Sequence, residues 1–192
     1  MESLADLCES AGSKLRIIAL CSPSNPSGSV LRNETSMHIA ALARNHSLKY
    51  DRDVWLFMDH TYWRLTFNKN RVPATLPLYE HTILVSSMNK DISLAGERFG
   101  YIVVNPSSKH SKSLAGWLAN NNDKLGNISP PSMIQYVLVD VYNKNGKPPN
   151  LKEIYEERVD LMHKNLLSIG LTCNKPDGSF YLFPALPSEI DD

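Results

Sequence analysis

Residues 87–100 read Ser-Met-Asn-Lys-Asp-Ile-Ser-Leu-Ala-Gly-Glu-Arg-Phe-Gly and follow an apolar run at 82–86 that is typical of a β-strand. The lysine, Lys90, comes three residues after Ser87 and eight residues before Arg98. A hydroxyl and a guanidinium both suit a bound phosphate. A lysine amine beside a phosphate suggests pyridoxal 5'-phosphate, which proteins hold as an imine on a lysine.

Two further polar groups follow strand-like runs upstream. Residues 25–28 read Asn-Pro-Ser-Gly and come after the run 15–20, and residues 59–62 read Asp-His-Thr-Tyr and come directly after the run 54–58. Open α/β sheets bind their ligands beyond the carboxyl ends of the strands. We therefore expect these two groups and the segment around Lys90 to meet at one edge of a sheet.

Short apolar runs alternate with helical patterns over the first two-thirds of the chain. A helix is predicted from about Asn33, a candidate N-cap, and its apolar residues point to most sides, so we expect it to be largely buried. A fourth short strand is predicted at 99–104. This alternation favours an α/β fold, part of a three-layer sandwich with a mostly parallel sheet covered on both faces.

The last third has a different character. Apolar spacing predicts one helix around Ile134 to Tyr142, which ends in the breaker cluster 143–149, and a long helix from Leu151 to Ile169, which Gly170 stops. An aromatic strand is predicted at 179–183, with no partner strand after it. This last third is a second unit, which we expect to be incomplete.

Composition excludes several classes of protein. The 192 residues include 42% apolar and 21% charged side chains, and 20 acidic residues balance 20 basic ones. This balance indicates neither nucleic acid nor an anionic membrane as a partner. No run is apolar over the length that a bilayer requires, and the cysteines do not have metal-ligand spacing. Residues 1–6 have neither a basic start nor an apolar run, so we do not expect them to act as a signal peptide. Three widely spaced cysteines favour reduced thiols in a cytoplasmic protein.

The order of these groups resembles the fold-type-I pyridoxal-phosphate aminotransferases of class I/II, the aspartate aminotransferase superfamily. That family has an Asn-Pro-Thr/Ser-Gly turn, an Asp-x-x-Tyr after a strand, and a Ser-x-x-Lys with an arginine eight residues later. The segment 176–184 also resembles the entry strand of its small domain. The resemblance implies that residues 1–150 form the C-terminal part of the large, cofactor-binding domain, and that 151–192 form a connecting helix and the start of the small α+β domain.

The resemblance also implies a role for each candidate residue. Lys90 forms the imine with pyridoxal 5'-phosphate and later moves a proton, as an amine can. Asp59 pairs with the pyridine nitrogen, while Tyr62 and Asn25 donate to the phenolate oxygen. Ser87 and Arg98 bind the phosphate. His60 is interpreted as a structural neighbour.

The implied reaction transfers an amino group from an amino acid to a 2-oxo acid, in an enzyme that forms a homodimer. The family's earlier phosphate loop and its carboxylate-binding arginine have no counterpart here, so the chain is expected to be truncated at both ends and impaired in catalysis. Two alternatives stay open. One is a catalytically silent homologue that acts as a binding or dimerisation module, and the other is a lyase or decarboxylase that uses the same lysine.

Overall fold

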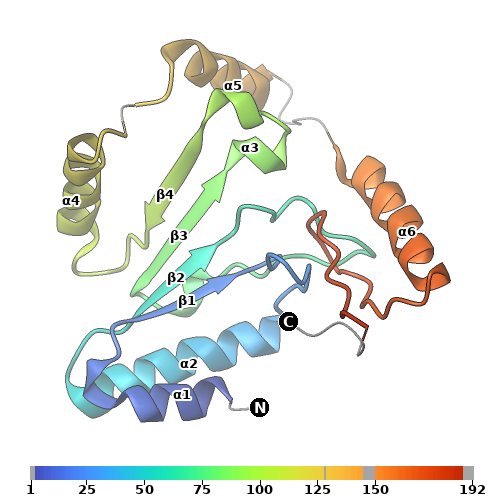
Figure 1. Ribbon diagram of the computed structural model, residues 1–192. Coiled ribbons are helices and arrows are strands. Elements are labelled where there is room, and N and C mark those ends of the chain that lie inside the picture. Colours follow the sequence, from blue (N-terminus) through green and yellow to red (C-terminus); the bar gives the residue numbers. More distant parts are fainter. Residues whose placement is uncertain (1–2, 128, 145–149, 188–192) are drawn as a thin grey trace.

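A four-stranded sheet forms the centre of the computed structural model, which describes residues 3–127, 129–144 and 150–187 (Figure 1). Its strands are β1 (Ile17–Cys21), β2 (Trp55–Asp59), β3 (Thr82–Ser87) and β4 (Gly100–Val104), in that spatial order. β1, β2 and β3 are parallel, and β4 pairs antiparallel with β3. The mostly parallel α/β sheet that the sequence predicted is thus confirmed, with strand ends that differ by one or two residues.

Two helices, α1 (Leu4–Ala11) and α2 (Asn33–Tyr50), lie together along one face of the sheet (Figure 1). Between them and the strands lies the main core, built from buried side chains of α1, α2, β1 and β2 and the segments beside them: Cys8, Ile18, Ile39, Ala40, Ala43, Val54, Leu56, Met58 and Tyr79. Burial of this apolar surface is the main force that holds the helices to the sheet.

Two details of the α2 prediction were wrong. Asn33 is the first residue of the helix, whereas Arg32 occupies the N-cap and makes no side-chain cap bond. The helix is also not buried on most sides, because Met37 and Leu48 are 51% and 76% exposed. Its buried stripe includes the polar side chains of Ser36 and His46, which a count of apolar residues overlooks.

The remaining helices are α3 (Met88–Asp91), α4 (Ser111–Lys124), α5 (Ser132–Lys144) and α6 (Lys152–Ser168). α5 and α6 were predicted, whereas α1 and α4 were not. None of the described side chains of α4 is buried. In the part of the chain that the structure describes, no helix is long and apolar enough to cross a membrane.

The aromatic strand predicted at 179–183 does not form. The nearby pairing consists of two isolated bridges, Thr66 with Gly178 and Thr172 with Ala185, and Ser179 has a positive φ of 65° that interrupts an extended strand. The breaker residues 145–149 and the two terminal aspartates lie outside the described residues. The predicted boundary at residue 150 falls directly beside the first of these gaps.

Candidate active site

The carboxyl ends of the three parallel strands place the predicted site residues at one edge of the sheet. Asp59 is the last residue of β2, in register with Cys21 of β1 and Val85 of β3. Ser87 ends β3, and Asn25 follows β1 in a turn. Parallel strands that share a register end at the same edge, and in Figure 1 the segment 172–187 lies between this edge and α6.

Asp59 is half-buried, and one of its carboxylate oxygens is already fixed. Oδ1 accepts a hydrogen bond from the Thr61 backbone N–H at 2.9 Å and another from the Thr61 hydroxyl at 2.6 Å. The adjacent Cys21 thiol donates to Pro23 O at 3.2 Å. Burial raises the pKa of this thiol, and the nearby Asp59 charge raises it further, so Cys21 stays protonated at neutral pH.

Tyr62 is buried and its hydroxyl lies 2.7 Å from the hydroxyl of Tyr181. Burial raises the pKa of Tyr62, and the hydrogen bond with Tyr181 raises it further. The phenol therefore stays protonated and can donate at physiological pH. The exposed amide of Asn25 also donates to the Tyr181 hydroxyl, at 3.4 Å. Tyr181 thus joins two predicted cofactor-binding residues from different loops.

Lys90 lies in the short helix α3 and is half-buried. Its ammonium Nζ lies 5.7 Å from the centre of the Phe180 ring, within the range of a cation–π contact. The Phe180 ring in turn stands edge-on to the Tyr62 ring, with 5.4 Å between the centroids. Phe180 is therefore the link through which Lys90 joins the group formed by Tyr62, Tyr181 and Asn25.

Ser87 and Arg98, the two predicted phosphate ligands, make local contacts. The Ser87 hydroxyl caps α3 by accepting from the Asn89 N–H at 3.1 Å, and it lies 3.3 Å from Phe99 O. Arg98 is exposed, adopts a left-handed conformation with φ of 51°, and donates to Ala95 O at 3.1 Å. Within the described residues, these side-chain hydrogen bonds of Ser87 and Arg98 thus lie inside the segment 87–99.

Sequence reasoning missed Tyr181 and Phe180 as members of the site and treated them as part of a strand. The turn before them docks on the loops that bear Asn25 and Tyr62. Asp177 N and Gly178 N donate to Gly28 O at 3.0 and 2.9 Å, and Ser179 N donates to Leu65 O at 2.7 Å. Residues 176–178 read Pro-Asp-Gly, which is typical of a turn, but this local pattern does not reveal the surface on which the turn packs.

The structural role interpreted for His60 stays a prediction. Its side chain is 6% exposed, and its Nε2 has no hydrogen-bond partner among the described atoms. Burial lowers the pKa of the imidazole, against the opposing charge of Asp59. No cluster of three or more His, Cys, Asp or Glu in the described ranges could hold a metal ion.

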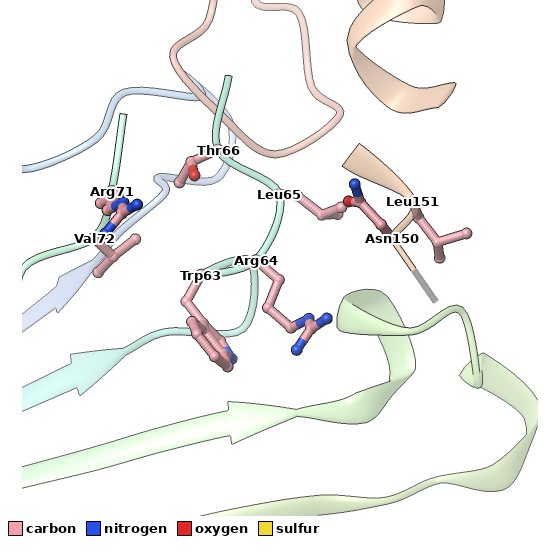
Figure 2. A pocket seen from close by; sticks show the side chains of 8 residues that line it. All are labelled: Trp63, Arg64, Leu65, Thr66, Arg71, Val72, Asn150 and Leu151. Carbon is pink, nitrogen blue, oxygen red and sulfur yellow. The ribbon is translucent and has the colours of Figure 1, made fainter. Parts of the chain in front are cut away.

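A separate cavity of about 390 Å³ lies beside the loop that follows Tyr62. Figure 2 shows its lining, in which the Arg64 side chain extends near the Trp63 ring, 5.6 Å from its centre. None of the six predicted site residues lines it. Its wall is formed by two stretches of this loop and the two residues that precede α6: Trp63, Arg64, Leu65, Thr66, Arg71, Val72, Asn150 and Leu151.

Fold and site together define an α/β protein with a lysine in a short helix at the carboxyl edge of a mostly parallel sheet. Residues 1–191 match the sequence pattern of the family described as Aminotransferase class I and II. The chain belongs to this family.

Individual relatives agree with this assignment. The chain is 31% identical over 188 residues to the putative aminotransferase YugH of Bacillus subtilis, covering 96% of this chain and 45% of that protein. It is 29% identical over 175 residues to a probable N-acetyl-LL-diaminopimelate aminotransferase of the same bacterium. The structure of an aminotransferase from Eubacterium rectale superposes with a TM-score of 0.84 at 30% identity, over 93% of this chain and 44% of that one. The chain thus spans less than half the length of these relatives.

Proposed function

We propose that this chain takes part in the transfer of an amino group from an amino acid to a 2-oxo acid, with pyridoxal 5'-phosphate bound at Lys90. The observation that supports this proposal best is the convergence of Lys90, Tyr62 and Asn25 on the segment Phe180–Tyr181, at the sheet edge where Asp59 ends β2. These residue types match what the cofactor's amine-reactive carbon, phenolic oxygen and pyridine nitrogen require.

The residues present fit the ring of the cofactor. Asp59 has Oδ1 fixed by Thr61, which holds the carboxylate while its second oxygen can accept from a pyridinium N–H. Tyr62 is protonated and can donate to a phenolate. For the phosphate, Ser87 offers a hydroxyl and Arg98 a planar fork of N–H donors. Both would exchange their present local bonds for the phosphate.

When bound, the cofactor supplies an electron-accepting ring that stabilises negative charge on the substrate Cα. Asp59 favours this by keeping a positive charge on the ring nitrogen through its own negative charge. Lys90 would hold the cofactor through its Nζ, and the free amine of Lys90 would take up and release a proton at Nζ. Phe180 lies beside Nζ and would cover one side of the amine.

The proposal includes the organisation implied by the family resemblance. Residues 1–150 belong to the large cofactor-binding domain, and 151–192 to the connecting helix and the small domain. The working form is a homodimer that uses an amino acid and a 2-oxo acid, and it neither binds nucleic acid nor inserts in a membrane. Free thiols at Cys8, Cys21 and Cys173 support a cytoplasmic location.

Covalent labelling tests the central claim. The purified chain is incubated with pyridoxal 5'-phosphate, reduced with borohydride, and its peptides are mapped by mass spectrometry. We expect a stoichiometric label on Lys90 and a loss of this label in Lys90→Arg. The matched control is Lys109→Arg, an exposed lysine that precedes α4. A label spread over many lysines, or none, would show that the chain has no specific cofactor site.

A second candidate is a catalytically silent binding or dimerisation module. Several apolar side chains on α5 favour it, because Met133 and Tyr136 are 75% and 77% exposed and Val139 is 56% exposed, and such surfaces often serve as interfaces. The two candidates predict different absorption spectra. A cofactor bound through Lys90 absorbs visible light, whereas a silent module stays colourless with pyridoxal 5'-phosphate.

A further inference from the structure

Tyr181 lies in the candidate site, although none of the sequence motifs predicted a role for it there. Its hydroxyl lies 2.7 Å from the Tyr62 hydroxyl and 3.4 Å from the Asn25 amide nitrogen. Both neighbours are the residues proposed to donate to the cofactor's phenolic oxygen. A residue that bonds both donors at once can determine which way each of them points.

Counting protons shows what this arrangement leaves available. A tyrosine hydroxyl has one proton and two acceptor lone pairs, and an asparagine amide has two N–H groups. If Tyr181 accepts from Asn25 and donates its own proton to Tyr62, then the Tyr62 proton and the second Asn25 N–H both stay free. An anionic oxygen beside Tyr62 selects this order, because it favours donors over lone pairs at its surface.

The surroundings hold Tyr181 in place for this role. Its ring packs on Phe180 with 4.9 Å between centroids and stands at 80° to the Tyr62 ring at 5.5 Å. Its backbone N–H donates to the hydroxyl of Ser179 at 3.3 Å, and Ser179 is fully buried. The hydroxyl is therefore held next to the turn that docks on Gly28 and Leu65.

We propose that Tyr181 is a positioning residue that orients Tyr62 and Asn25 toward one shared anionic oxygen, the phenolate of a bound 3-hydroxypyridine. This inference rests on the proposed function, since that function names the ligand. It adds Tyr181, from the segment after α6, to the residues that recognise the phenolate, which were expected to come from the strand-end loops alone. Pre-oriented donors discriminate more sharply than donors that must first rotate into place.

The ligand test compares two probes on the same chain. The first is 4'-deoxypyridoxine 5'-phosphate, which has the phenolic oxygen but no aldehyde to react with Lys90, and the second is its 3-deoxy analogue, which lacks that oxygen. We expect the unmodified chain to prefer the first probe in equilibrium titrations. Tyr181→Phe should lower this preference by about tenfold, the effect of one lost hydrogen bond of ordinary strength, with little change for the 3-deoxy probe.

The matched control is Tyr79→Phe, because Tyr79 is a buried tyrosine whose hydroxyl bonds Ser47 at 2.9 Å within the core under α2. This variant also loses a tyrosine hydroxyl bond but should leave the preference between the probes unchanged. An unchanged preference in Tyr181→Phe would overturn the inference. Equal weakening of both probes would also overturn it, since that result reports lost packing only.

If neither probe binds, unfolding measurements on the ligand-free chain test the inference. That outcome contradicts the proposed function, and the inference is then judged on the unfolding midpoints of Tyr62→Phe, Tyr181→Phe and the double variant. Non-additive losses, with the double variant no worse than the poorer single one, support coupled hydroxyls. Additive losses overturn the inference, because hydroxyls that do not interact cannot orient one another.

Discussion

Single carboxylates show how strongly the surroundings of a residue decide its role. Asp59 lies at a strand end and has one oxygen fixed by two bonds from Thr61. Asp53 lies before β2 and is shared by two histidines: Oδ2 is 2.9 Å from His110 Nε2 and Oδ1 is 3.2 Å from His81 Nε2. The first arrangement leaves an oxygen for a ligand, whereas the second anchors three segments of the chain to one another.

The Asp53 cluster makes stability depend on pH. Burial opposes ionisation of the Asp53 carboxyl, but His110, His81 and Lys109 outweigh it and lower its pKa. A carboxyl with a lowered folded pKa stabilises the fold above its unfolded pKa of about 3.9, and that contribution is lost as the pH falls through the folded pKa. We therefore expect the midpoint temperature of thermal unfolding to decrease when the pH is lowered below about 4.

Asp53→Asn should remove part of that acid dependence and destabilise the chain near neutral pH, where the carboxylate is charged. Thermal unfolding measured across the pH range tests this. The control Asp123→Asn changes an exposed carboxylate on α4 and should keep the acid dependence of the parent. Parallel pH curves for Asp53→Asn and the parent would show that the cluster contributes no proton-linked stability.

At the scale of elements, the docking of one turn on another assembles the site. Gly28 has φ of 69°, and a Cβ at this position would lie 2.3 Å from Pro176 Cβ and 2.8 Å from Gly178 O. Gly178 is similarly crowded, because a Cβ at this position would lie 2.6 Å from Leu65 O. Two glycines therefore permit the contact that brings Tyr181 to Tyr62 and Asn25.

Gly28→Ala should destabilise the chain by about 2–3 kcal/mol, because it adds both a strained backbone and a clash. Denaturant unfolding measures this loss. The control is Gly116→Ala, in the interior of α4, where a Cβ meets nothing within 4 Å; it should stabilise by about 0.5–1 kcal/mol. Equal stability of Gly28→Ala and the parent would mean that the two turns are not docked in solution.

For the whole molecule, the open edges of the sheet are the main feature. In the described ranges the sheet ends at β1 on one side and at β4 on the other. Ile17 of β1 is 56% exposed and Ile102 of β4 is 53% exposed. Exposed edge strands with apolar side chains pair readily with other chains. The relatives that match are more than twice as long, so they have additional chain that could cover such surfaces.

We expect the isolated chain to associate with increasing concentration, and Ile102→Lys to reduce this association several-fold. A lysine on an edge strand opposes pairing with another strand. Sedimentation velocity over a range of concentrations gives the measurement. The control Lys112→Arg changes an exposed position on α4 without altering charge. Association that stays the same in Ile102→Lys would assign it to another surface, such as α5.

The sequence by itself determined the α/β class, the approximate positions of the strands, and the grouping of Asn25, Asp59 and Ser87 at strand ends. It could do so because alternating apolar runs and turn residues are local signals, and because parallel strands place their ends at a common edge. The roles of these residues remain predictions.

The tertiary structure alone decided which residues from distant parts of the chain meet. Tyr181 reaches Tyr62 across 119 positions and Asn25 across 156, and Phe180 lies against Lys90. The expected strand at 179–183 became an irregular segment because the positive φ of Ser179 and the docked turn outweigh the extended preference of aromatic residues. Strand propensity is a weak preference set by neighbouring residues. The packing of the turns at Gly28 and Gly178 depends instead on contacts between residues far apart in the sequence.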